Sequence, residues 1–225
     1  MIRKILFILF ALIALNSQIN AQGIEFFFST LPNKYLVQLD QTKRQVLLNK
    51  FRNQKDSTIL NNYMGESKLL ICDEENEYIR MQTSSQGNWA AKKFTLPDGE
   101  PLFALCNWVC APACDGDLSF FKGNNITPVK SNNFVPLLQF KDFFIADSLL
   151  AYDINPDKVE DCFDMIFVHY EPQQNSDTLL VIIDNETYMG EKDFAKWRRR
   201  MKGNKLPLIW KGNEFAIGEA FFDEK

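Results

Sequence analysis

The feature that most restricts the fold is an apolar run at residues 102–110, where nearly every side chain is hydrophobic. Successive side chains of a β-strand point to opposite faces of the sheet, so a strand can be apolar throughout only if both faces are covered. We therefore expect residues 102–110 to form a central strand, with a packed layer on each side of its sheet.

Shorter strand patterns surround this run. Residues 69–72 and 78–82 flank an acidic tip at 73–76, which predicts a hairpin. Residues 89–96 form a third strand pattern, and residues 117–121 are expected to pair back onto the central run. In the second half of the chain, further strands are predicted at 163–170 and 178–184, and a final hairpin at 206–210 and 214–217.

Helical patterns lie apart from these strands. The chain opens with a helical segment near residues 26–30, and Asp40 is placed to cap a helix over 41–51. Its expected buried face is Val46, Leu47, Leu48 and Phe51. Asn155 followed by Pro156 predicts another helix start, and residues 191–201 form an amphipathic helix. Because helices and hairpins are segregated, the predicted class is α+β, with N-terminal helices, an antiparallel sheet of hairpins, and a C-terminal helix plus hairpin.

The first 21 residues have the three zones of a secretory signal peptide. Arg3 and Lys4 supply the positive zone, residues 5–15 are apolar, and a polar stretch leads to Ala21. Eleven apolar residues are too few to cross a bilayer, which needs about 20. We expect cleavage between Ala21 and Gln22, and a soluble periplasmic or extracellular protein with no membrane span in its mature form.

Length and charge bound the remaining chain, residues 22–225. It is long enough for one α+β domain, and if it divides into two subdomains, the boundary is expected near 124–133. The whole chain has a formal net charge of −4, and loss of Arg3 and Lys4 makes it more acidic. Nucleic acids and anionic membranes reward clustered positive charge, so neither is expected as the main partner.

Three of the five cysteines, Cys106, Cys110 and Cys114, are evenly spaced. On one strand, Cys106 and Cys110 would be roughly 13 Å apart, too far for a disulfide. Ala111, Pro112 and Ala113 can turn the chain, so we predict a Cys110–Cys114 disulfide. Two unpaired thiols and a metal site are the alternatives, although the spacing matches no zinc pattern. At least one of Cys72, Cys106 and Cys162 must be free, and a free cysteine is expected to be a small core residue.

A search for catalytic chemistry finds little. His169 is the only histidine and is expected to be a partly buried structural residue on a strand face with Phe163, Met165 and Phe167. No phosphate-binding glycine loop, zincin motif or Gly-x-Ser-x-Gly turn is present. Asp115 and Asp117 bracket a glycine and are turn residues, calcium ligands or a pair of catalytic acids, and turn residues are the expected interpretation. We therefore assign no catalytic residue, no metal ligand and no cofactor.

One basic cluster follows the stripe formed by Phe194, Trp197 and Met201. With that stripe buried, its charges face solvent at the helix end, where they suit the helix dipole. They either serve solubility alone or form a docking site for an anionic partner. The cluster consists of Lys196, Arg198, Arg199, Arg200 and Lys202, with Lys205 nearby.

The combined pattern resembles a bacterial domain-of-unknown-function family, number 3256. The opening of that family is similar to Leu31, Pro32, Tyr35 and Leu36, followed by Arg44, Leu47 and Leu48. Its middle is similar to Asn61, Gly65, Glu66, Ser67 and Lys68, and to Cys110, Ala111 and Pro112 before residues 117–121. Its closing hairpin is similar to residues 208–215. The resemblance implies an exported α+β protein and carries over no activity and no catalytic residue.

Three functions are compatible with the sequence. The leading hypothesis is a non-catalytic binding or interaction protein of the bacterial envelope, acting on a protein partner or a small ligand. The first alternative is an envelope hydrolase that uses Asp115 and Asp117, which would require carboxylates that converge in a pocket. The second is a thiol–disulfide carrier that uses Cys110 and Cys114, which would require an exposed and readily reduced pair.

Overall fold

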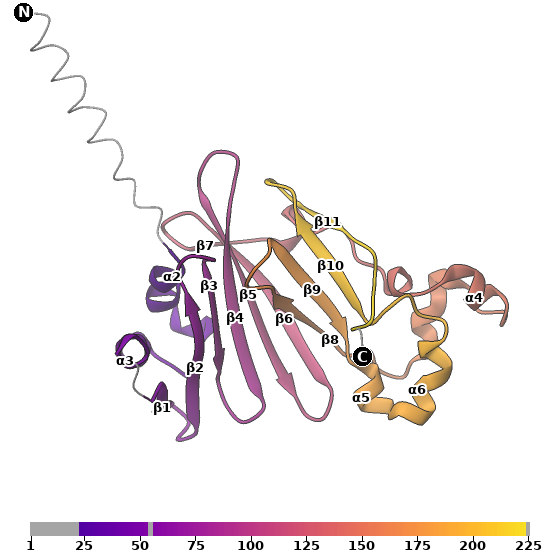
Figure 1. Cartoon of the computed structure of the whole chain (residues 1–225), viewed down its shortest axis with the longest axis horizontal. Coiled ribbons are helices and arrows are strands. Elements are labelled where there is room, and N and C mark those ends of the chain that lie inside the picture. The colour runs from indigo at the N-terminus through magenta and orange to yellow at the C-terminus, as the bar shows by residue number, and fades with distance from the viewer. Residues whose placement is uncertain (1–22, 54–55, 224–225) are drawn as a thin grey trace, which may run out of the picture.

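Strand β5 (Pro101–Cys110) lies in the middle of a seven-stranded antiparallel sheet and is covered on both faces (Figure 1). Leu102 and Ala104 point into one core, whereas Phe103 and Leu105 point into another. The computed structural model describes residues 23–53 and 56–223, so the predicted signal peptide lies outside the described residues. The α+β prediction is confirmed.

The seven-stranded sheet is a meander in which every strand pairs with its neighbours in sequence. The hairpin predicted around 73–76 and the return strand after β5 are both present. The strands beside β5 are β1 (Thr58–Leu60), β2 (Glu66–Asp73), β3 (Tyr78–Gln82), β4 (Gly87–Thr95), β6 (Cys114–Lys122) and β7 (Thr127–Val129).

Two N-terminal helices cover one face of this sheet, α2 (Ile24–Thr30) and α3 (Gln41–Arg52), with the 3₁₀ turn η2 (Asn33–Tyr35) between them. Asp40 caps α3 as predicted, since its side chain accepts a hydrogen bond from the backbone N–H of Lys43 at 2.9 Å. The predicted buried face was partly wrong. Val46 is exposed, and the fully buried side chain of Arg44 lies on the covered face beside Leu47 and Leu48.

A second, four-stranded antiparallel sheet packs against the other face of β5. Its strands follow the order β11-β10-β9-β8 and again pair only with sequence neighbours. Leu179, Val181 and Leu208 meet Ala104 and Phe120 of the first sheet in one core. The strands are β8 (Val168–Pro172), β9 (Thr178–Ile183), β10 (Lys205–Trp210) and β11 (Phe215–Ile217), the last two forming the predicted final hairpin.

Short helices gather at the end of the molecule beside the second sheet, and we call this region the helical lobe (Figure 1). Asn155 caps η5 as predicted, because its side chain accepts a hydrogen bond from the backbone N–H of Asp157. The lobe consists of η4 (Phe140–Phe143), α4 (Ala146–Leu150), η5 (Pro156–Cys162), α5 (Asn185–Met189) and α6 (Glu191–Arg198), while η3 (Ser131–Asn133) precedes it.

Two predicted boundaries were wrong. The strand expected at 163–170 begins only at Val168, because the buried Asn185 side chain bonds the backbone of the preceding residues. The helix expected at 191–201 ends at Arg198, because Arg200 and Met201 pair with the chain near Phe144 instead. Within the described ranges, none of the helices is both long and apolar enough to span a membrane.

Candidate functional site

An aromatic cluster forms the interior of the helical lobe. The ring of Phe163 lies 4.5 Å from that of Trp197 on α6 and 5.1 Å from that of Phe140 on η4. Phe144 packs edge-on against Trp197 at 6.4 Å. These contacts hold α6 against η4 and η5. The position of α6 is therefore fixed, and its opposite face points to solvent.

Helix α6 has the charge order that favours a helix in isolation. Glu191 and Asp193 lie in its first turn, and Lys196 and Arg198 in its last turn. The acidic side chains therefore lie at the positive end of the helix dipole and the basic side chains at its negative end, where each is stabilised. Because Phe194 and Trp197 are buried, as the sequence predicted, the basic side chains point away from the core.

Three of the five predicted docking cations are already engaged within the chain, and the Nζ atom of Lys196 lies 5.4 Å from the ring centroid of Trp197. The Nη1 atom of Arg198 donates a hydrogen bond to Glu186 Oε2 at 2.6 Å, and its guanidinium lies 4.4 Å from the ring centroid of Phe222. The guanidinium of Arg200 lies 3.7 Å from the ring centroid of Tyr152. Arg200 is thus held over an exposed aromatic ring, since 64% of Tyr152 is accessible to solvent.

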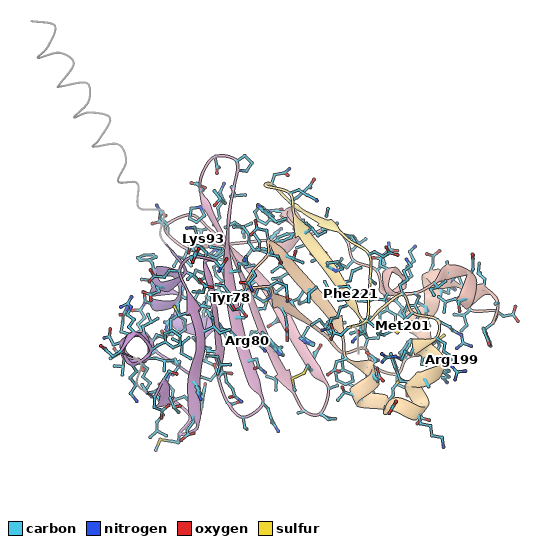
Figure 2. The ribbon with its side chains drawn as sticks, viewed as in Figure 1. Tyr78, Arg80, Lys93, Arg199, Met201 and Phe221 are labelled. Carbon is cyan, nitrogen blue, oxygen red and sulfur yellow. A yellow bond between two sulfur atoms is a disulfide. The ribbon has the colours of Figure 1, made fainter. Side chains whose placement is uncertain are left out.

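The side chains of Arg199 and Lys202 have no hydrogen-bond or aromatic partner among the described residues. Lys196, Arg199 and Lys202 are exposed, and none forms an ion pair with any residue in the part of the chain that the structure describes. Figure 2 shows Arg199 in the helical lobe, far from Tyr78 and Arg80 in the first sheet. We call the following set the basic patch: Lys196, Arg198, Arg199, Arg200 and Lys202, with exposed Ile145, Leu150 and Tyr152 beside them.

The basic patch is continuous across α4 and the end of α6. The backbone N–H of Ile145 donates to the carbonyl of Arg200 at 2.8 Å, and that of Lys202 donates to the carbonyl of Phe143 at 2.8 Å. These bonds fix the residues after α6 against the end of η4 and the start of α4. Arginine and tyrosine beside exposed aliphatic side chains match the composition of protein-binding hot spots. The sequence revealed the cations, but it gave no sign that Tyr152 would join them.

The predicted disulfide joins Cys110 and Cys114 across the tip of the β5–β6 hairpin, where the two residues are direct partners in the register. Of the other cysteines, Cys106 is a buried core residue as expected, whereas Cys162 is exposed. Burial raises the pKa of Cys72 to about 11 and also raises that of Cys106. Neither of these two thiols is therefore a ready nucleophile near neutral pH.

Asp115 and Asp117 lie on β6, close to the disulfide, with exposed side chains. The Oδ1 atom of Asp115 accepts a hydrogen bond from the backbone N–H of Val168 at 3.2 Å, which ties β6 to the start of β8. Neither carboxylate lines any of the four grooves described on the molecule. Asp115 thus links β6 to β8, and neither aspartate has around it the convergent pocket that the hydrolase hypothesis required.

The single histidine belongs to a polar cluster between the sheets that the sequence did not reveal. His169 is buried and stacks on Trp108 with ring centroids 5.9 Å apart. Its Nε2 atom lies 3.6 Å from Oε1 of Glu171, and Arg80 approaches the same oxygen at 4.0 Å. The interaction with His169, and to a lesser degree that with Arg80, lowers the pKa of Glu171 against the opposing effect of burial.

The sequence contains a signal for part of this cluster. His169 and Glu171 are two residues apart, and residues at that spacing in a strand share a face. Arg80 and Trp108 come from distant strands, and only the packing of β8 on the first sheet brings them in. Phe163, Met165 and Phe167, expected beside His169 on one strand face, precede β8 instead. No group of three or more potential metal ligands occurs within residues 23–53 and 56–223.

Comparison with known proteins gives a fold and a family but no activity. A domain of an uncharacterized protein from Porphyromonas gingivalis W83 has a similar structure, with a TM-score of 0.71 at 18% sequence identity. The likeness covers 87% of this chain and 98% of that domain, and at this identity it concerns the fold alone. No curated protein matches the sequence. The model of one family, described as "Protein of unknown function (DUF3256)", matches residues 16–215, and the chain therefore belongs to that family.

Proposed function

We propose that this chain is an exported binding module that docks an acidic protein partner on its basic patch. The observation that carries the proposal is the stacking of Arg200 on exposed Tyr152, next to the free cations Arg199 and Lys202. The signal-like zones of residues 1–21 support export, and the lack of convergent catalytic groups at Asp115 and Asp117 favours binding over hydrolysis.

Charge complementarity identifies the partner's chemistry. The chain as a whole is acidic, with 29 acidic against 25 basic residues, yet five cations fall within seven residues at the end of α6. A solubilising surface needs no such concentration of one sign on an acidic protein. A partial desolvation of arginine over an aromatic ring strengthens its attraction to a carboxylate. We therefore expect a partner segment rich in aspartate or glutamate, with an apolar side chain that packs on Tyr152.

Native mass spectrometry of the protein purified undenatured from its own cell envelope tests this proposal. The wild type is compared with a chain carrying Arg199→Glu and Lys202→Glu. The wild type should retain an acidic protein whose mass is absent from the variant, and the association should weaken as salt is added. A chain with Lys130→Glu and Lys211→Glu is the control, because it has the same charge change on exposed side chains outside the patch.

The same comparison shows what would contradict the docking proposal. If the wild type, the patch variant and the control carry the same associated proteins, the basic patch is not a docking site. The denatured mass of the same sample, measured after alkylation of thiols, checks the expected cleavage after Ala21 and counts the disulfides. A mass that includes residues 1–21 would contradict export by signal cleavage.

A further inference from the structure

A groove lies along the outer edge of β2, beyond the point where β1 stops pairing with that strand. It has a volume of about 810 Å³. Figure 1 shows β2 at this side of the first sheet, with α3 and the short β1 beside it. We call it the edge groove, and it is lined by residues 70–74 together with Glu25, Phe51, Arg52 and Gln174.

The backbone of β2 forms the floor of the edge groove. Five consecutive residues, 70–74, line it, and successive side chains of a strand point to opposite faces. A consecutive run can therefore line one groove only along the edge of its strand. On this side β1 pairs with β2 only as far as Lys68, and the backbone N–H of Leu69 donates to the carbonyl of Ser57 at 3.0 Å. Among the described residues, no strand pairs with residues 70–73 on this side, so the edge offers backbone N–H and C=O groups to a ligand.

Both layers that cover the first sheet contribute a wall to the edge groove. On the helical side, the Nε atom of Arg52 on α3 donates a hydrogen bond to Oε1 of Glu25 on α2 at 3.1 Å. On the opposite side, Nε2 of Gln174 from the β8–β9 loop donates to Oδ2 of Asp73 at 2.6 Å. A free strand edge between two walls selects an extended chain, because only an extended backbone can continue the ladder of hydrogen bonds.

The charge of the edge groove is negative. Three carboxylates and one guanidinium line it, and the guanidinium of Arg52 is already paired with Glu25. Asp73 and Glu74 form no ion pair with any residue that the structure describes. Hydrogen bonds to Asp73, chiefly from the backbone N–H of Asn76, lower its pKa to about 2. Its charge therefore persists well into acid, and this end of the groove favours a basic side chain.

Apolar side chains also line the edge groove. Leu70 is 40% exposed, and Phe51 and Ile71 are half-buried. An apolar side chain of a bound segment would remove this surface from water. In an added strand, alternate side chains face opposite walls, so basic and apolar residues in alternation suit the groove.

A second copy of this chain would be a poor occupant. Pairing of two β2 edges would place the unpaired carboxylates of Asp73 and Glu74 from both copies in one contact, with no added cation to offset them. Like charges that meet across an interface disfavour the complex. The charge of the groove therefore favours a different, basic partner.

We propose that the edge groove binds an extended basic segment of another protein by strand addition. The segment continues the first sheet beyond residues 70–73, and a lysine or arginine in it pairs with Asp73 or Glu74. An apolar residue of the segment packs against Leu70 and Phe51. This site is independent of the proposed function of the basic patch, so either proposal can fail while the other holds.

Three synthetic decapeptides, titrated with the full chain and followed by fluorescence anisotropy, are the first test. Each has valine at alternate positions, and the remaining positions are lysine, glutamine or glutamate. The lysine peptide should bind saturably, and the other two should bind at least about tenfold more weakly. Two further lysine peptides carry N-methyl groups on either the valine or the lysine backbone nitrogens. One of these two should lose binding, because only one set of N–H groups in a strand faces its neighbour.

Amide hydrogen exchange locates the bound peptide. The lysine peptide should slow exchange within residues 70–73 and leave β7, the opposite edge of the same sheet, unchanged. Glu74→Lys should lower the affinity about tenfold. Glu214→Lys makes the same charge change at an exposed position outside the groove and should alter the affinity less than about twofold. The denaturation midpoint of each variant shows whether it is folded.

The proposal is overturned if the lysine peptide does not bind, if both N-methylated peptides bind as tightly as their parent, or if residues 70–73 gain no protection. Equal affinities of Glu74→Lys and Glu214→Lys for the lysine peptide would also overturn it. If residues 70–73 become protected without peptide as the protein concentration rises, the occupant is a second copy and the proposal is wrong.

Discussion

The buried guanidinium of Arg44 connects α3 to the end of α2, and its replacement by methionine tests how that connection is stabilised. Its nitrogens donate hydrogen bonds to the carbonyls of Phe28 at 2.7 Å and Leu31 at 2.6 Å, and to Oδ1 of Asn33 at 2.7 Å. Each bond from a charged donor contributes about 2 kcal/mol net, or roughly 6 kcal/mol for the three.

Burial of the charge opposes this gain. It lowers the pKa of Arg44 to about 10, the nearby Asp40 acting weakly in the other direction. At about 1.4 kcal/mol for each pKa unit, the penalty is roughly 3 kcal/mol. Methionine fills a similar volume and removes both the bonds and the penalty. We therefore expect Arg44→Met to lower the free energy of unfolding by about 3 kcal/mol.

Equilibrium urea denaturation measures this change through the midpoint, with an unchanged slope as evidence for the same folded state. Gln45→Met, on the exposed side of the same helix, is the control and should alter the free energy of unfolding by at most about 0.5 kcal/mol. An Arg44→Met chain as stable as the wild type would refute the reasoning. It would mean that the buried charge costs as much as its hydrogen bonds contribute.

Three further perturbations follow from the structure. In Gly203→Ala, the added Cβ would lie 2.1 Å from backbone atoms of Phe221, which cannot swing aside, so we expect a loss of about 3 kcal/mol and faster amide exchange in this segment. The pKa of Glu171 is lowered in the folded state, chiefly by His169, so its contribution to stability is present above the unfolded pKa and disappears as the pH falls through the folded pKa. Glu171→Gln should therefore make stability less steeply dependent on pH below about 4.5, as measured by urea midpoints from pH 3 to 6. Asn61→Ala should lower the unfolding free energy by about 2 kcal/mol, as measured by the urea midpoint, because backbone groups of Tyr63, Gly65 and Thr83 lose their hydrogen-bond partner.

Local patterns predicted the elements whose cause is local. The apolar run of β5 required two covered faces, and two covering layers are present. Asp40 and Asn155 form the helix caps expected of them. These features depend on side-chain periodicity or on one hydrogen bond within a few residues, so the sequence contains all the information they need.

The misplaced elements depend on distant partners. Residues 163–167 have a strand pattern, but Asn185 supplies bonds from its amide to the backbone of Met165 and Phe167 in place of a neighbouring strand. Arg44 lies on the buried face of α3 because its guanidinium donates hydrogen bonds to the carbonyls of Phe28 and Leu31. The charges of the basic patch were visible in the sequence, whereas the contact between Arg200 and Tyr152 arises only from the packing of separate segments.

The order of strands in the two sheets has a consequence for how the chain acquires its structure. Each sheet comes from one uninterrupted stretch, β1 to β7 and then β8 to β11, so every pairing is between sequence neighbours. Such short-range pairing favours rapid assembly. The first sheet can form before the second sheet has folded, but Leu102, Ala104 and Phe120 are then exposed to solvent. A chain that ends before β8 would leave this hydrophobic face exposed, and aggregation should then compete with folding.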